Sequence, residues 1–260
     1  MPRRISSLLF FAAAIALGVS SPASAAMLNL RWNACWGDGG VQNRVFACDR
    51  NTGSEVLVAS FVPNYDFPLM TADEFAVDLA TAGTTLAEWW MFMEPGNCRL
   101  TSLAMVSEPP ASSVACAEWD EAQAGGLFVG FTFSVFGDNS ARILGLHAMP
   151  DGLSAPVLAG HEYHAFTLII NHQKTVGSGA CGGCTLGACI AFKSFRMSSP
   201  DPNVYQVLQI GSRFGPDPSD ALVTWQGGTG VILPAPGGMS CPAATPARNS
   251  TWGAVKSLYR

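Results

Sequence analysis

Eight cysteines constrain this chain more than any other feature, because all of them follow an N-terminal segment with the pattern of a secretory leader. Arg3 and Arg4 form its charged start, Leu8–Val19 its apolar stretch, and Ala23-Ser24-Ala25 its small-residue cleavage site. We therefore predict that residues 1–25 are a signal peptide and that the remainder is exported. In an oxidising compartment an even number of cysteines most simply forms disulfides.

The leader leaves two export routes open. The Arg3-Arg4 pair also fits a twin-arginine signal, which would export the protein already folded, but paired basic residues are common in ordinary leaders. No second apolar run approaches the length of a transmembrane helix. The expected location is outside the cell, at the cell surface or in the periplasm.

Short strand-like runs fill the rest of the chain. They are rich in Val, Ile, Phe and Thr, they end at turn-forming residues, and some alternate in polarity, as Phe75, Val77 and Leu79 do. The predicted strands are Leu28–Trp32, Arg44–Cys48, Glu55–Val62, Glu74–Leu79, Arg99–Val106, Leu127–Val135, Arg142–Ala148, Glu162–Asn171, Ala188–Met197, Val204–Ile210 and Leu222–Trp225. This spacing predicts an all-β fold, an antiparallel β-sandwich of jelly-roll type, over residues 26–232.

Three local patterns refine this prediction. The run Leu127–Phe136 is apolar on both faces, which predicts a central strand covered on both sides. Gly145 interrupts a strand and indicates a bulge or the close approach of another backbone. A single helical turn is expected at Thr84–Met91, with Thr84 or Thr85 as its cap.

The C-terminal part changes character. Residues Leu233–Asn249 contain four prolines and no periodicity, which predicts a linker that precedes a tail, Ser250–Arg260. On a helical count the tail carries an apolar face beside two basic residues, typical of a docking or sorting peptide. The alternative is a terminal element that packs back onto the sandwich. The residues concerned are Trp252, Val255, Lys256, Tyr259 and Arg260.

Two disulfides are predicted from turns. Cys35 and Cys48 flank a glycine-rich turn, and Cys98 and Cys116 bracket a proline-containing loop. Each pair is close enough in sequence for a bridge across one loop.

The other four cysteines cannot be paired from sequence alone. Because Cys181 and Cys184 are too close together for a comfortable structural bridge, we expect one to reach Cys241 and the other Cys189. The CxxC spacing also raises redox chemistry, or a zinc site with Cys189 and either His172 or Cys241. Glycines surround the motif and no helix follows it, which favours structural disulfides.

Catalytic motifs are weak. His161-Glu162-Tyr163-His164 has the wrong spacing for a zinc-protease helix and lies in a predicted strand. His164 and His172 lie too far apart along that strand to share one metal ion. We expect neither a metal nor a cofactor, and we assign no catalytic residue.

A secreted hydrolase is the alternative from another functional class. Asp73-Glu74 and Asp120-Glu121 are carboxylate pairs, and a fold can bring two acids together in ways that sequence does not reveal. A polysaccharide hydrolase would place two acids, Glu88 or Asp120 among them, in a cleft beside Trp89 or Trp119.

Seven tryptophans raise the question of carbohydrate binding, because exposed aromatic faces stack on sugar rings. Trp89, Trp90 and Trp119 are the candidate ligand-binding residues. Since Trp89 and Trp90 are adjacent, we expect at least one to be partly exposed or to lie under a loop. The alternative is that most of the tryptophans belong to the core.

Three segments resemble a family of uncharacterised secreted bacterial proteins: Leu28–Cys35, Gly179–Cys184 and the closing Trp252–Arg260. The resemblance spans nearly the whole chain after the leader and implies no activity or binding residues. More loosely, the pattern from Arg142 to Met197 is similar to cohesin-like and other jelly-roll modules, which implies a fold and not a ligand.

The net charge of −5 excludes the basic footprint of a nucleic-acid-binding protein. Together these patterns predict an exported, non-catalytic β-sandwich. It would serve as a surface, matrix or ligand-binding module whose partner is a polysaccharide or another cell-surface component.

Overall fold

The computed structural model describes residues 26–228, except 124, 136 and 212–216. The predicted leader (1–25), linker (233–249) and tail (250–260) lie outside the described residues, so these predictions stay predictions. In the described part, no helix is long and apolar enough to span a membrane.

The larger sheet of the described chain has seven strands, in the order β2-β14-β12-β5-β9-β8, with β13 also paired to β12. Its neighbours pair antiparallel except β14 and β2. The bounds are β2 Asn43–Arg44, β5 Ala72–Thr81, β8 Gly126–Phe133, β9 Ser140–Ala148, β12 Ala188–Ser198, β13 Tyr205–Gln209 and β14 Leu222–Trp225.

The smaller sheet has the order β1-β3-β11-β6, with the short β7 parallel to β11. A separate pair joins β10 to β4. The bounds are β1 Met27–Trp32, β3 Ser54–Val62, β4 Phe67–Met70, β6 Leu103–Val106, β7 Ala117–Glu118, β10 Ala155–Val157 and β11 Tyr163–Asn171.

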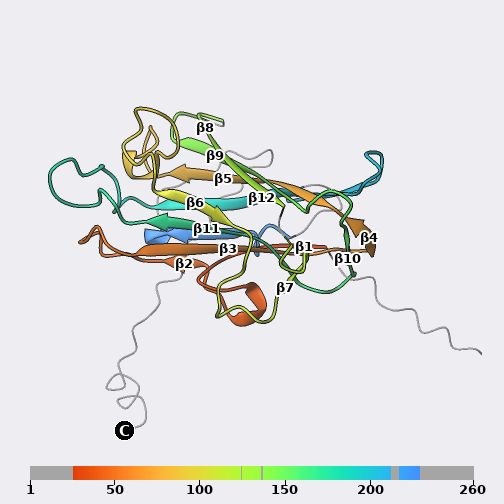
Figure 1. Cartoon of the computed structure of the whole chain (residues 1–260). Helices are drawn as coiled ribbons and strands as arrows, with labels where there is room; N and C mark the ends of the chain where they lie inside the picture. Colours follow the sequence, from red (N-terminus) through yellow and green to blue (C-terminus); the bar gives the residue numbers. More distant parts are fainter. Residues whose placement is uncertain (1–25, 124, 136, 212–216, 229–260) are drawn as a thin grey trace, which may run out of the picture.

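The two sheets pack face to face, and their strands run in nearly the same direction (Figure 1). Alternate residues of each strand point into the shared core, which explains the period-2 pattern of Phe75, Val77 and Leu79. On β11, Phe166 and Leu168 face them from the opposite sheet and are fully buried. The predicted all-β sandwich, held by disulfides, is therefore confirmed.

Several short elements differ from the predictions. The strands β4, β7 and β10 were not predicted, because runs of two to four residues carry too little alternation to be recognised. The predicted strand Arg44–Cys48 is shortened to the two residues of β2.

The predicted helical turn at Thr84–Met91 is the short 3-10 helix η2, Glu88–Trp90. It begins after Ala87 without a side-chain cap, so the prediction that Thr84 or Thr85 caps it was wrong. Two further 3-10 turns are η1, Trp36–Asp38, and η3, Gln226–Gly228.

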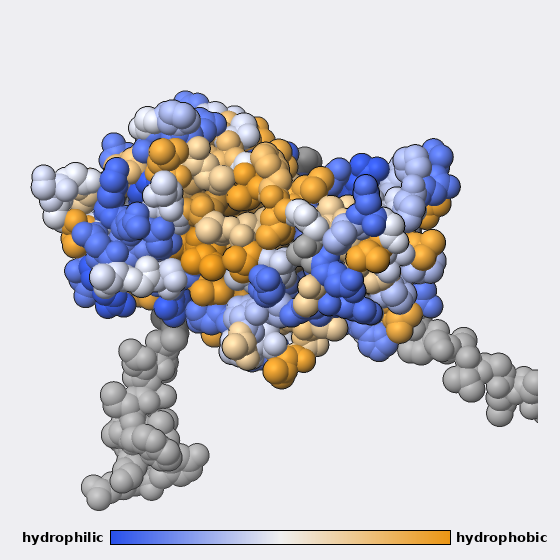
Figure 2. All heavy atoms as spheres, viewed as in Figure 1, coloured by the Kyte–Doolittle hydropathy of each residue, from blue (hydrophilic) through white to orange (hydrophobic). Residues whose placement is uncertain are grey.

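The strand β8 is an edge strand, which corrects the prediction that Leu127–Phe136 is central. Among the described residues it pairs with β9 alone. Phe128 is 63% exposed, and its cross-strand neighbour Leu146 on β9 is 36% exposed. Figure 2 shows apolar residues gathered in the middle of this view, over the region of β6, β8 and β9. A run that is apolar on both faces therefore does not establish burial, because the order of strands decides which of them is covered.

Gly145 on β9 makes room for a side chain rather than for a bulge or a backbone. The β9 ladders to β5 and β8 continue through it without a register shift. A Cβ at Gly145 would lie 2.0 Å from the ring of Phe75, its partner on β5. That ring cannot yield easily, because it stacks on Phe166 with centroids 3.6 Å apart.

We expect Gly145→Ala to lower the free energy of unfolding by about 3 kcal/mol, because it overpacks a buried aromatic stack. Gly126→Ala on the neighbouring strand β8 is the control, since nothing lies within 4 Å of its Cβ position. It should change stability by less than about 0.5 kcal/mol. Urea unfolding of both variants measures this, and equal losses would show that ring packing does not explain Gly145.

Candidate functional site

Two ionisable side chains are buried on the inner face of the seven-stranded sheet. Asp73 on β5 and His147 on β9 are cross-strand partners, and both are at most 1% exposed. Asp73 is in phase with Phe75 and Val77, so it points into the core as they do. The phase of this strand was a signal in the sequence that Asp73 is buried rather than in an exposed loop.

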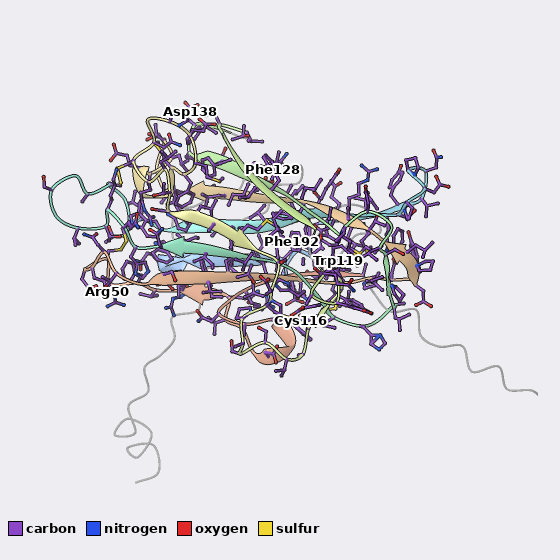
Figure 3. The ribbon with its side chains drawn as sticks, viewed as in Figure 1. Arg50, Cys116, Trp119, Phe128, Asp138 and Phe192 are labelled. Atoms are coloured by element: carbon purple, nitrogen blue, oxygen red, sulfur yellow. A yellow bond between two sulfur atoms is a disulfide. The ribbon has the colours of Figure 1, made fainter. Side chains whose placement is uncertain are left out.

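The loop after β7 brings a second carboxylate to the same histidine. His147 Nε2 lies 3.1 Å from Asp120 Oδ2, and His147 Nδ1 lies 3.5 Å from Asp73 Oδ2. Trp119 covers the imidazole, with the ring centroids 4.8 Å apart, and it lies in the interior beside β7 (Figure 3). The imidazole thus stands between two carboxylates that belong to distant parts of the chain.

Burial and pairing act against each other on the pKa values in this cluster. Burial would lower the pKa of His147, but its hydrogen bond to Asp120 and its close charge interactions with Asp73 and Asp120 prevail and raise it to about 9. Burial raises the pKa of Asp73 to about 6, although contacts with His147 and Trp119 oppose it. Burial also acts to raise the pKa of Asp120, but the hydrogen bond and positive charge of His147 lower it overall. At neutral pH the cluster therefore holds one cation between two anions.

A second buried histidine lies nearby in the opposite sheet. His164 on β11 is 1% exposed, and its Nε2 lies 2.9 Å from the hydroxyl of Thr167. Burial, together with the positive charge of His147, lowers the pKa of His164 to about 3. It is therefore neutral at physiological pH and serves the packing of β11.

This geometry is that of a structural link rather than of a catalytic centre. Both ring nitrogens of His147 face carboxylates, so neither is free to exchange a proton with a substrate. Asp73 and Trp119 Nε1 lie close to each other, but among the described residues neither has a well-aligned hydrogen bond. The cluster is enclosed, with side-chain exposures of at most 4% for His147, Asp73 and Asp120.

The tryptophans predicted to bind a ligand lie in the core. Trp89, Trp90 and Trp119 are at most 2% exposed. Trp89 stacks on Trp225 with centroids 4.9 Å apart, and Trp90 meets the same ring edge-on. The guanidinium of Arg99 lies 3.7 Å above Trp89. The expectation of an exposed sugar platform at these three residues is therefore wrong, because all three rings fill the space between strands and loops.

The disulfides join segments that are distant in sequence. Cys35 bonds to Cys116, Cys48 to Cys184 and Cys98 to Cys181. The predicted pairs Cys35–Cys48 and Cys98–Cys116 were wrong, because the bridges cross between loops instead of closing hairpins.

The CxxC cysteines likewise bond to neither of their expected partners. Cys181 and Cys184 bond to two other loops, so neither reaches Cys189 or Cys241. Cys189 is also disulfide-bonded, and Cys241 lies outside the described residues. Oxidised sulfurs exclude the zinc and dithiol alternatives for this motif.

The histidine motif serves the fold. His161 is exposed, whereas His164 is buried. Glu162 between them accepts hydrogen bonds from the backbone N–H groups of Trp36 and Gly37, at 3.2 and 3.0 Å. It thereby holds the η1 loop against the sheet.

His172 is separate from this motif. Its Nε2 lies 2.9 Å from Glu55 and its Nδ1 lies 2.8 Å from the carbonyl of Thr52, while Phe46 stacks on the ring. Arg44 also donates to Glu55. His172 is thus part of a buried link between β2, β3 and the end of β11.

The carboxylates predicted for a hydrolase do not face a common cleft. Asp73 and Asp120 approach His147, whereas their sequence neighbours Glu74 and Glu121 are exposed. Glu88 is exposed as well and accepts a hydrogen bond from the N–H of Gly182 at 3.1 Å. Asp120 does lie beside Trp119, as a hydrolase would require, but both are enclosed.

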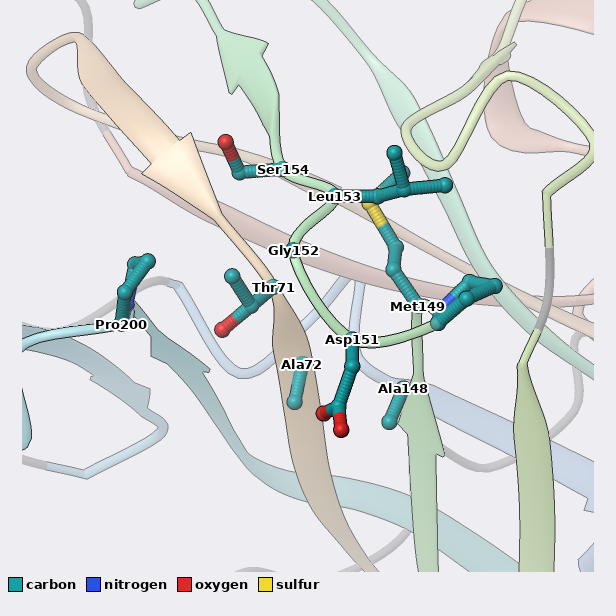
Figure 4. Close-up of a pocket in the computed structure, with 10 residues that line it drawn as sticks. Thr71, Ala72, Ala148, Met149, Asp151, Gly152, Leu153, Ser154 and Pro200 are labelled. Carbon is teal, nitrogen blue, oxygen red and sulfur yellow. The ribbon is translucent and has the colours of Figure 1, made fainter.

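A surface pocket of 340 Å³ lies where β5 begins and β9 ends. Thr71 and Ala72 lie in its middle, with Pro200 on one side and Ala148 and Asp151 on the other (Figure 4). Among the described residues, Asp151 is the one charged side chain that lines it. The other polar side chains that line it are the hydroxyls of Thr71 and Ser154.

Three disulfides among the described residues fit a compartment outside the cytoplasm. Their presence, the enclosed acids and the exposed β8 edge are the features that a function must explain. No protein-family model matches this chain, and no curated protein matches it in sequence.

Proposed function

We propose that this protein is an exported, non-catalytic β-sandwich module that acts by binding or assembly at the cell surface or in the surrounding matrix. The observation that carries the proposal is the edge strand β8. Phe128 on this strand is 63% exposed, and Leu144 and Leu146 on β9 extend the apolar surface. Edge strands in natural proteins are usually protected by charges, prolines or bulges, whereas an exposed apolar edge marks an interaction site.

The polar features of the fold support binding over catalysis. The acids best placed for chemistry, Asp73 and Asp120, are occupied with His147 and enclosed. A hydrolase needs two carboxyl groups that face a substrate across an open cleft. A polysaccharide is compatible with this proposal, but it would have to bind surface residues, because Trp89, Trp90 and Trp119 are buried.

Cosedimentation with surface material from the producing cells tests this function. We expect the wild type to pellet with that material, and Phe128→Lys/Leu146→Lys to bind several-fold less, because two charges are placed on the apolar patch. Tyr205→Lys/Val207→Lys on β13 is the matched control, since these side chains are similarly exposed elsewhere on the same sheet. It should bind like the wild type.

The same samples distinguish a binding protein from a polysaccharide hydrolase. Release of reducing sugars that Asp120→Asn abolishes would replace the proposal by an enzymatic function. If the wild-type protein stays in the supernatant with every fraction of surface material, binding to that material is wrong as well.

A further inference from the structure

We propose that the occupant of the β8 edge is a second copy of this chain, which pairs with it antiparallel and joins the two seven-stranded sheets. This inference rests on the proposed function and names its partner. Three observations support it. Alternate backbone groups of β8 point to an edge that no described residue pairs with, the strand has no charged side chain, and one antiparallel register places Phe128 of each copy opposite Gly130 of the other.

The pairing of β8 with β9 shows which backbone groups of β8 have no partner among the described residues. Ser134 N donates to Ser140 O at 2.8 Å, in register with the β8–β9 ladder. On the other side of β9, Met149 N donates to Thr71 O at 2.9 Å. Because alternate residues of a strand direct their N–H and C=O to opposite sides, the even-numbered residues of β8 face β9. The odd-numbered residues, Leu127, Val129, Phe131 and Phe133, direct theirs to the open edge.

The strand itself carries nothing that repels an identical strand. Its eight residues include no charged side chain and no proline. On the outer face behind it, Arg142 is neutralised by Asp78 at 2.7 Å. A charged or bulged edge opposes pairing with its own copy, whereas an uncharged one does not.

The β1 edge of the smaller sheet shows the contrast. On β1, Leu30 N donates to Asp220 O at 2.9 Å, and Trp32 N donates to Val41 O at 2.8 Å. Arg31 also forms an ion pair with Asp220. The β1 edge is therefore covered by the chain itself. Among the described residues β8 is the longest of the edge strands, with eight residues, and it pairs on one side only.

A two-fold axis at Val129 makes β8 complementary to itself. Odd residues then face odd residues across the axis, as the free backbone groups require, and Phe128 of each copy lies opposite Gly130 of the other. An aromatic ring that covers a glycine is a stabilising arrangement in sheets. The Phe128 ring already lies 3.4 Å from the Cβ position of its own Gly130, so it is placed over this part of the strand.

A proline at position 129 tests the pairing without breaking the sandwich. Val129→Pro removes an N–H that faces the open edge and leaves the β8–β9 ladder its hydrogen bonds, and edge strands tolerate proline at such positions. Val129→Ala keeps the N–H and is the matched control. By sedimentation equilibrium we expect a wild-type dimer, a dimer dissociation constant at least tenfold weaker for Val129→Pro, and dimerisation retained by Val129→Ala.

Spin labels at Thr132→Cys report the direction of pairing. In the antiparallel register the two Thr132 positions are about 20 Å apart along the paired strands, whereas parallel pairing would bring them to about 5 Å. A distance near 20 Å in the dimer supports the proposal. The short distance, or a dimer that Val129→Pro leaves intact, overturns it.

The two proposals fail in different ways. If the wild type is monomeric at about 100 μM but Val129→Pro no longer cosediments with cell-surface material, the edge binds another strand and only self-pairing is wrong. If the wild type neither dimerises nor binds, the proposed function fails too.

Discussion

Replacing Cys48 and Cys184 together by alanine is expected to lower the free energy of unfolding by about 4 kcal/mol. This disulfide joins residues 136 positions apart, and it connects the loop after β2 to the loop before β12. Its removal releases a long loop in the unfolded chain, although Cys98–Cys181 still shortens that loop. Against a typical domain stability of about 5–15 kcal/mol, the loss should be visible as a large shift of the urea midpoint.

The Cys35→Ala/Cys116→Ala variant separates chain entropy from native packing. Its cysteines are 81 positions apart, and the stabilisation from loop closure varies only slowly with length. If chain entropy dominates, the two variants lose stability to within about 0.5 kcal/mol of each other. A much larger loss for Cys48 and Cys184 would assign the effect to the core beside Cys184, whose carbonyl accepts the indole N–H of Trp225 at 2.7 Å. A loss below about 1 kcal/mol for both would contradict the expectation.

The fold class could be predicted because a sandwich repeats one local pattern in many strands. Phe75, Val77 and Leu79 show it clearly, and most of the long strands lie where the sequence places them. What could not be predicted is the order of strands. That order alone makes β8 an edge, and its composition would suit a central strand equally well.

The cluster of Asp73, His147 and Asp120 could be predicted from the sequence only in part. The inward phase of Asp73 could have marked it as a buried acid, since burial of a charge without a partner is costly. Its partners could not be found, because β9 and the loop after β7 reach it through sheet pairing and loop closure. The disulfide pairing was predicted wrongly for the same reason, since Cys35 bonds to Cys116 in a distant loop and not to a cysteine across one turn.

His147→Leu is expected to destabilise the protein by about 3–5 kcal/mol at pH 7, because it leaves Asp73 and Asp120 buried without their cation. The measurement is urea unfolding at several pH values. His161→Leu is the control, since His161 is exposed and its replacement should change stability by less than about 0.5 kcal/mol.

The pH dependence of the wild type separates the electrostatic role of His147 from its packing. The folded pKa of His147 is raised from 6.5 to about 9, so its stabilisation is complete below pH 6.5 and is lost as the pH rises through 9. Linkage puts this loss of stability on the order of 3 kcal/mol.

Below pH 6.5 two other buried groups change the stability of the wild type. The pKa of His164 is lowered to about 3, so stability falls as the pH drops below 6.5. The raised pKa of Asp73, about 6, opposes that fall between pH 6 and 3.8. Wild-type stability should therefore peak near pH 6.

The Leu variant should follow a different curve. Without the imidazolium, acidification protonates both buried carboxyl groups and relieves their repulsion, so the variant gains stability relative to the wild type as the pH falls from 7 to 4. Above pH 7 the wild type loses the His147 contribution that the variant never had. The gap between the two curves should be widest near pH 6.5–7 and narrow on both sides. Parallel curves would mean that the imidazole acts only by filling space, and that the buried cation does not hold the two carboxylates together.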